Sequence, residues 1–215
     1  MAINTDHRLD LVTPSTGSEK LAGTLVLPKT TNVGIQVDTT TPTWGWRDLM
    51  GPIDVRAGGV GNPTWATFIT NINAYRFAVN DECWINFHIP HDYVPGTDLF
   101  LHTHWAITTT STANVTWSFD LSYAKGHNQA AFPATVNTTV VQAGSGIANQ
   151  HMIAETQITG GALLTLGDIE VDGIILAHIK LTANATGVDP FLFCSDIHYQ
   201  SSNMATKNKA PGFYA

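Results

Sequence analysis

Hydrophobic and polar residues alternate along most of the chain beyond residue 82, which is the pattern of half-buried β-strands. In residues 82–89 this pattern predicts that Cys83, Ile85 and Phe87 share one face of a strand. Residues 64–78 fit both a short helix and an irregular strand, because periodicity alone does not separate the two. The other predicted strands cover residues 98–107, 114–126, 150–158, 170–183 and 189–200.

Turn signals separate these strands and indicate an antiparallel fold. Residues 94–97 (Val-Pro-Gly-Thr) place Pro and Gly where a type II turn requires them, and further glycine turns fall at residues 144–146, 160–161 and 186–187. A short helical turn is expected near residues 162–166. Because no long amphipathic helix interrupts the strands, the sequence predicts an all-β antiparallel β-sandwich, specifically a jelly roll.

The first 43 residues differ from the rest of the chain. They contain no aromatic side chain, and their apolar patches, such as Leu25-Val26-Leu27, are short. Such a stretch cannot bury enough apolar surface by itself. Residues 1–43 are therefore expected to be an extended N-terminal arm that orders against a partner or the domain, or else a partly disordered tail. Residues 44–205 are predicted to form the jelly-roll domain, and residues 206–215 a C-terminal tail.

Composition narrows the function classes. Charged residues make up only 13% of the chain, about half the usual share, which indicates a surface partly covered in an oligomer or assembly. The net charge of −7 argues against a nucleic-acid-binding protein. Cys83 and Cys194 fit no metal-binding spacing and form either two reduced thiols or one disulfide. With no apolar signal sequence and no run of 18 apolar residues, the chain is expected to be made in a cytoplasm and not to span a membrane.

Residues 88–105, HIPHDYVPGTDLFLHTHW, contain four of the nine histidines. His102 and His104 are two residues apart on a predicted strand, so their side chains project from one face, as when a β-barrel presents two imidazoles to a metal ion. The string GTDLFLHTH resembles the opening of the first cupin motif. Cupins place a Glu about four residues beyond the second His, whereas WAITTTSTANV contains no carboxylate, and no second cupin motif follows.

A metal ion at this pair would need further ligands. His91 and His198 are candidates alongside His102 and His104, since neutral imidazoles suit zinc, nickel or copper. The alternative is that these histidines pack within the sheet or across a subunit interface, and no cofactor is then bound.

The residue patterns predict that the chain is not an enzyme. No GxSxG motif occurs, neither cysteine neighbours a histidine, and the glutamates are too sparse for an acid–base pair. Asp196 and His198 share a face of a predicted strand and form either an Asp–His couple or a polar strand end. Asp92 is predicted to stabilise the turn that follows it.

The stretches WGWRDLMG, YRF, IPHDYVPGTDLFLHTHW and DIHYQ together resemble a family of tailed-bacteriophage virion proteins. The resemblance spans roughly residues 44–200, and the IPHDYVPGTDLFLHTHW block is its most specific part. It implies a homotrimeric jelly roll on the virion exterior, either a capsid decoration (cement) protein or a fibre-like head or tail appendage, and no catalytic residues.

On this basis the chain is expected to decorate the capsid as a homotrimer that binds the major capsid protein, without contact to nucleic acid or membrane. The expected capsid contacts are Leu25, Val26, Leu27, Trp44 and Trp46, and the expected trimer contacts are His102, His104 and Trp105. Two alternatives stay open. One is a head-fibre or tail appendage whose loops at residues 126–138 and 142–150 bind host-surface glycans. The other is a cupin-like metalloprotein.

Overall fold

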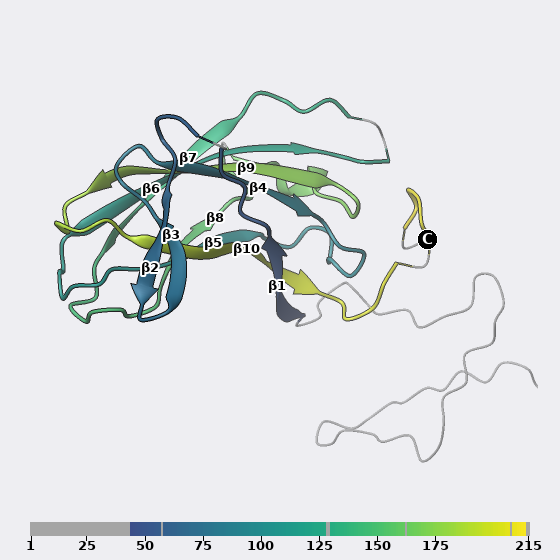
Figure 1. Cartoon of the computed structure of the whole chain (residues 1–215). Helices are drawn as coiled ribbons and strands as arrows, with labels where there is room; N and C mark the ends of the chain where they lie inside the picture. The colour runs from purple at the N-terminus through teal and green to yellow at the C-terminus, as the bar shows by residue number, and fades with distance from the viewer. Residues whose placement is uncertain (1–43, 57, 128–129, 162, 207, 214–215) are drawn as a thin grey trace, which may run out of the picture. The chain divides into compact units, whose positions relative to one another are not determined.

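The computed structural model describes residues 44–56, 58–127, 130–161, 163–206 and 208–213. In this part of the chain two antiparallel β-sheets pack face to face (Figure 1). The predicted all-β sandwich is therefore confirmed. Among the described residues there is no helix with the length and apolar character needed to cross a membrane.

The strands are distributed unequally between the two sheets. The six-stranded sheet contains β1 (Gly45–Gly51), β2 (Thr64–Ile69), β3 (Ile72–Arg76), β5 (Phe100–Ala106), β8 (Met152–Gln157) and β10 (Phe191–Ser201). The four-stranded sheet contains β4 (Glu82–His88), β6 (Asn114–Ala124), β7 (Val136–Ala143) and β9 (Ile174–Asn184). A 3₁₀ turn, Leu166–Asp168, follows β8, slightly later than the helical turn expected from the sequence.

The strand order is that of a jelly roll. One sheet runs β2-β3-β10-β5-β8, with β1 also paired to β10, and the other runs β4-β9-β6-β7. The chain crosses between the sheets from β4 to β5 to β6, and again from β7 through β8 and β9 to β10. β1 and β3 share one side of β10, because β1 pairs with Ser195–Ser201 and β3 pairs only with Phe191 and Leu192.

The core lies between the sheets and follows the predicted alternation. Cys83, Ile85 and Phe87 on β4 are all buried, as predicted. The core-facing side chains of β6 are Val115, Trp117, Phe119 and Leu121. Burial raises the pKa of the Cys83 thiol to about 12, and both Cys83 and Cys194 are free thiols, so the disulfide alternative is wrong.

Turn chemistry is also as predicted at residues 94–97. Gly96 has a φ of +81°, the left-handed conformation that position three of a type II turn requires. The amide of Thr97 donates to the carbonyl of Val94 over 3.2 Å. β5, which carries the histidine pair, begins three residues after this turn.

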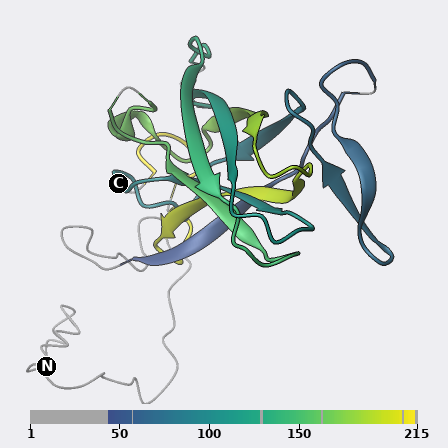
Figure 2. The ribbon, with the colours of Figure 1, turned by 90° about the vertical axis from the view of Figure 1, so that its left-hand side faces the viewer.

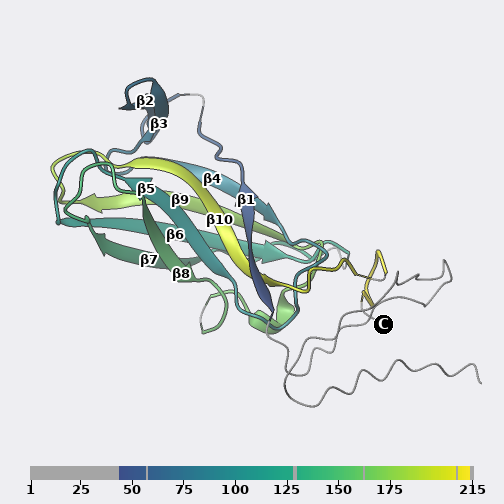
Figure 3. The same cartoon turned by 90° about the horizontal axis from the view of Figure 1, so that it is seen from below.

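The structure decides two regions that the sequence left ambiguous or assigned to a loop, residues 64–78 and β7. Within residues 64–78, β2 and β3 form a hairpin, so the strand alternative is correct there, and the hairpin stands away from the sandwich (Figures 2 and 3). β7 begins at Val136, inside the loop predicted for residues 126–138. Only half of its residues are apolar and they do not alternate regularly with the polar ones, and the strand forms because all of it pairs with β6.

Candidate functional site

Two of the four candidate histidines lie together with a buried carboxylate on the six-stranded sheet. β10 pairs with β5 so that Asp196 is directly opposite His102, and residues opposite each other in a sheet share a face. His104, two residues further along β5, lies on this face as well. The predicted common face of the histidine pair is confirmed, and Asp196 is added to it.

This face points away from the core. Along β5, Leu101, Thr103 and Trp105 are fully buried in the sandwich, whereas His102 and His104 alternate with them on the outer face. Any metal ion held by this pair would therefore lie on the outside of the sandwich, and the cupin-like metalloprotein alternative stays a prediction.

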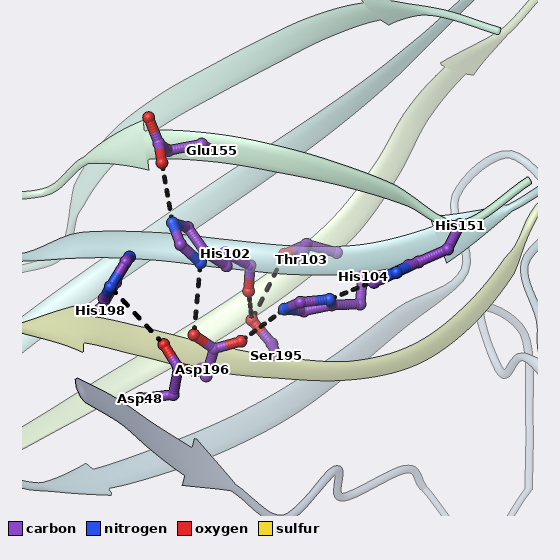
Figure 4. Close-up of polar contacts among 9 residues, drawn as sticks. All are labelled: Asp48, His102, Thr103, His104, His151, Glu155, Ser195, Asp196 and His198. Carbon is purple, nitrogen blue, oxygen red and sulfur yellow. Dashed lines mark hydrogen bonds and ion pairs between the residues drawn. The ribbon is translucent and has the colours of Figure 1, made fainter. Parts of the chain in front are cut away.

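Hydrogen-bonding groups surround both imidazoles (Figure 4). The Nε2 atom of His102 is 2.8 Å from Oε2 of Glu155, and its Nδ1 atom is 3.4 Å from Oδ2 of Asp196. The Nε2 atom of His104 is 2.6 Å from Oδ1 of Asp196, and its Nδ1 atom is 2.7 Å from Nε2 of His151. We refer to His102, His104 and Asp196 as the histidine–carboxylate cluster.

Buried hydroxyl groups beneath the cluster hold β5 and β10 in register. The Ser195 hydroxyl donates to the backbone carbonyl of His102, and Oγ1 of Thr103 is 3.3 Å from Oγ of Ser195. Both hydroxyl residues are fully buried. Because these bonds join adjacent strands on the inner face, they fix the separation of the histidines from Asp196 on the outer face.

Of the other two candidate histidines, His198 lies beside His102, with the ring centroids 4.9 Å apart, whereas His91 lies elsewhere. His198 lies with its Nε2 atom 3.9 Å from Oδ1 of Asp48, so the Asp196–His198 couple considered from the sequence does not form as a hydrogen-bonded pair. His91 is in the loop after β4, with its Nε2 atom 2.9 Å from Oδ1 of Asp172. A site built from all four histidines is therefore not assembled in this chain.

His91 belongs to a second group of histidines that surrounds Asp172. His127 contributes a 2.7 Å contact to Asp172, and His88 one of 3.3 Å. Burial acts to raise the pKa of Asp172, but the hydrogen bond from His127 and the charges of His91 and His127 outweigh it and lower the pKa. Phe213 from the C-terminal segment is buried and packs edge-on against His91 and His127.

Replacing Asp172 is expected to change stability mainly above about pH 4, the ordinary range of an Asp carboxyl. A lowered folded-state pKa means that the ionised carboxylate stabilises the fold above the unfolded-state pKa, and that this contribution is lost as the pH falls through the folded-state value. Asp172→Asn is expected to lower the Tm by roughly 2–4 °C at pH 6, equivalent to about 1 kcal/mol. Thermal unfolding followed by circular dichroism between pH 3 and 6 measures this difference.

Asp168→Asn is the matched control, because Asp168 is exposed and lies 3.8 Å from Lys125 across an exposed ion pair. It is expected to leave the Tm nearly unchanged at every pH. A difference between wild type and Asp172→Asn that does not shrink at low pH would contradict this account.

The predicted contact residues lie in different environments. Trp105 is fully buried, and its indole nitrogen donates to Oε1 of Gln142 over 2.8 Å, so its side chain packs in the core of one chain. Trp46 is half-exposed on the outer face of β1, and Trp44 is partly buried. Residues 25–27 lie outside the described residues. The trimer and capsid contacts themselves stay predictions.

A shallow hollow of about 310 Å³ opens where β1 leaves β10 and β3 begins to pair with it. Trp65, which is 60% exposed, packs edge-on against Tyr75 with the ring centroids 4.8 Å apart. The lining residues are Gly51, Ile53, Trp65, Asn73, Ala74, Tyr75, Leu192, Phe193 and Cys194. We call this hollow the aromatic notch. The aromatic notch could not be predicted from sequence periodicity, because it forms only where β1 and β3 both pair with β10.

Solved structures with a fold similar to this chain include three carbohydrate-binding domains. No protein-family model matches the chain, and no curated protein does. Among solved structures, a xylan-binding domain from CBM 22 is 14% identical, covers 73% of this chain and 97% of its own, and has a TM-score of 0.33. TmCBM61 in complex with β-1,4-galactotriose is 9% identical, with coverages of 72% and 88% and a TM-score of 0.29. CBM28, a non-crystalline cellulose specific carbohydrate-binding module, is 9% identical, with coverages of 69% and 85% and a TM-score of 0.32. At these values the similarity carries no conclusion about function.

Proposed function

We propose that this chain is a non-catalytic appendage protein of a bacteriophage particle that binds a neutral glycan through the aromatic notch. The single observation that carries the glycan-binding part is the notch itself, with exposed Trp65 supported by Tyr75 at one side of it. The virion setting rests on the resemblance of residues 44–200 to tailed-phage virion proteins.

The chemistry of the notch suits a sugar ring. The apolar C–H face of a pyranose packs on an aromatic ring, and its hydroxyl groups bind to amides and other neutral polar groups. Trp65 supplies the ring, and Asn73 is a polar, uncharged residue of the same lining. No Asp, Glu, Lys or Arg is among the lining residues, which favours a neutral glycan over a charged one.

The histidine-rich part of the molecule does not supply an obvious nucleophile. The Ser195 hydroxyl, directly beneath the histidine–carboxylate cluster, is fully buried and donates to the carbonyl of His102. A hydroxyl that is committed in this way and shielded from solvent is not available to attack a substrate. Glycoside hydrolysis uses a pair of Asp or Glu carboxyl groups beside the scissile bond, and none lines the aromatic notch, which supports binding rather than hydrolysis as the proposed role.

Trp65→Ala is expected to weaken binding of a neutral oligosaccharide at least tenfold, because the stacking surface is removed. Calorimetric titration of the purified full chain with xylan, cellulose and galactan oligosaccharides measures the affinity. Trp46→Ala is the control: Trp46 is also exposed, but it is not among the notch residues, so binding is expected to be unchanged. Equal affinity of wild type and Trp65→Ala would rule out the notch as the site.

The position on the particle is a separate part of the proposal. We expect a homotrimer on the virion exterior, attached as a head fibre or tail appendage. Capsid decoration through residues 1–43 stays a prediction, because those residues lie outside the described ones. Deleting residues 1–43 and measuring binding to empty capsids separates the two positions: capsid binding that is lost with the arm supports decoration.

A further inference from the structure

The histidine–carboxylate cluster brings metal-ligating atoms together at a largely buried site. Among the described residues, its three ligand atoms form one of two sets that lie within 4.8 Å of one another; the other set is Asp48, His102 and His198. Asp196 is 1% exposed and His102 is 7% exposed. A buried carboxylate is costly unless a positive charge or hydrogen bonds compensate for it.

One carboxylate oxygen of Asp196 lacks that compensation. Its Oδ1 atom is bonded to His104, but its Oδ2 atom is buried and has no hydrogen-bond partner among the described residues. The nearby Nδ1 atom of His102 is 3.4 Å away, and Nε2 of the same ring is engaged by Glu155 at 2.8 Å. When a neutral imidazole donates through Nε2, its Nδ1 atom carries a lone pair. Two lone pairs then face each other, which is unfavourable without a cation between them.

We propose that Nδ1 of His102, Nε2 of His104 and the carboxylate of Asp196 bind one divalent transition-metal ion, for which Zn²⁺ is the probe. Ligand atoms around a tetrahedral zinc ion with bonds of about 2.0–2.1 Å lie about 3.3 Å apart. The His102–Asp196 separation of 3.4 Å already matches this value. His104 contacts the other carboxylate oxygen, Oδ1, at 2.6 Å, so this hydrogen bond must give way when the metal binds, and the proton between the two atoms is released to solvent.

The surrounding groups are those that orient metal-binding histidines. A ligating imidazole usually donates its other N–H to a carboxylate or another acceptor, which holds the ring and its tautomer. Glu155 is in position to accept from Nε2 of His102, and Nε2 of His151 is in position to accept from Nδ1 of His104 (Figure 4). Both ligating rings therefore have a partner for the nitrogen that does not face Asp196.

The donor set selects the class of ion. Two imidazole nitrogens and one carboxylate oxygen suit zinc and its neighbours, whereas calcium and magnesium prefer oxygen ligands alone. An ion at this position ties β5 to β10, two adjacent strands of the six-stranded sheet. Its expected effect is stabilisation of the outer face of that sheet, independent of glycan binding at the notch.

Zinc binding to the purified full chain, first stripped with a chelator, tests this site. Calorimetry is expected to show one Zn²⁺ per chain, and a roughly 100-fold excess over the Kd should raise the Tm by about 5–10 °C. Asp196→Asn, which keeps the side-chain shape, and His104→Gln should each reduce the affinity at least 100-fold. Glu155→Gln should reduce it by about 10- to 100-fold, because only the orientation of His102 changes.

His178→Gln is the matched control, since His178 also lies between two carboxylates, Glu82 and Asp120, each 2.9 Å away, but on the four-stranded sheet. It should bind Zn²⁺ as wild type does. If Asp196→Asn does not fold, the visible spectrum of Co²⁺ bound to wild type and Glu155→Gln still reports tetrahedral nitrogen and oxygen ligation. Absence of one-to-one binding by wild type, or full affinity in His104→Gln, would overturn the proposal. So would stability that responds to pH but not to metal, since the cluster would then hold a proton instead.

Discussion

Trp105→Ala is expected to lower the free energy of unfolding by about 3–5 kcal/mol, the cost of removing a large aromatic side chain from a packed core. Trp105 is fully buried and packs edge-on against Trp117 of the opposite sheet. Its indole N–H also donates to Gln142 on β7, so one side chain connects the two sheets. For a chain of this size the Tm should fall by roughly 10 °C. Chemical denaturation and thermal unfolding measure the two quantities.

This substitution also tests the expected trimer contact. A residue that packs inside one chain destabilises the fold when it is removed, and the oligomeric state of the folded fraction is unchanged. Trp105→Phe retains a ring but loses the bond to Gln142, so a smaller loss of about 1–2 kcal/mol is expected. Dissociation of an oligomer by Trp105→Ala with no loss in unfolding free energy would restore Trp105 as a subunit contact and contradict its role in the core.

Asp92→Ala is expected to be almost as damaging, with a loss of about 2–4 kcal/mol. The Asp92 carboxylate accepts hydrogen bonds from Tyr199 at 3.0 Å and from Ser201 at 2.5 Å, and it pairs with Arg47 at 3.0 Å. Tyr199 and Ser201 are buried, so truncation leaves two buried hydroxyl groups without this acceptor. Equilibrium unfolding in denaturant measures the loss.

A second readout separates the carboxylate from a general packing effect. Burial, followed by the hydrogen bond to Asp92 and its charge, raises the pKa of Tyr199 to about 12. Asp92→Ala should therefore lower that pKa toward the ordinary value of about 10. Tyr123, whose pKa is raised to about 12 mainly by burial, is an internal control and should titrate unchanged. An unaltered Tyr199 titration in Asp92→Ala would show that the carboxylate does not act on this phenol.

Asp92 and Asp196 both form hydrogen bonds with residues that are distant in the sequence. From the sequence, Asp92 is expected to stabilise the turn that follows it, but its partners Tyr199 and Ser201 come from the far end of the chain. From the sequence, Asp196 forms either a couple with His198 or a polar strand end; in the structure its hydrogen bond is to His104 on another strand. Neither partner could be found from the sequence, because spacing reports which side chains share a face and not which strand lies next to them.

β7 and the β2–β3 hairpin show the same limit for secondary structure. The apolar and polar residues of β7 are equal in number but do not alternate regularly, so hydrophobic alternation does not reveal a strand that pairs along its length with β6. Residues 64–78 were ambiguous because apolar side chains recur at helical and strand spacing together. Pairing between β2 and β3 resolves that ambiguity, and the meeting of β3 with β10 beside β1 then creates the aromatic notch.

The sequence by itself determined the all-β class, the buried face of β4 and β6, the type II turn at residues 94–97 and the common face of His102 and His104. These features depend on the two-residue period of a strand and on local backbone chemistry, so they can be read from neighbouring residues. Only the tertiary structure decided that the histidine face points outward and that Asp196 and Glu155 flank His102. Those outcomes depend on strand order and register, which are set by burial summed over the whole sandwich and have no local signature.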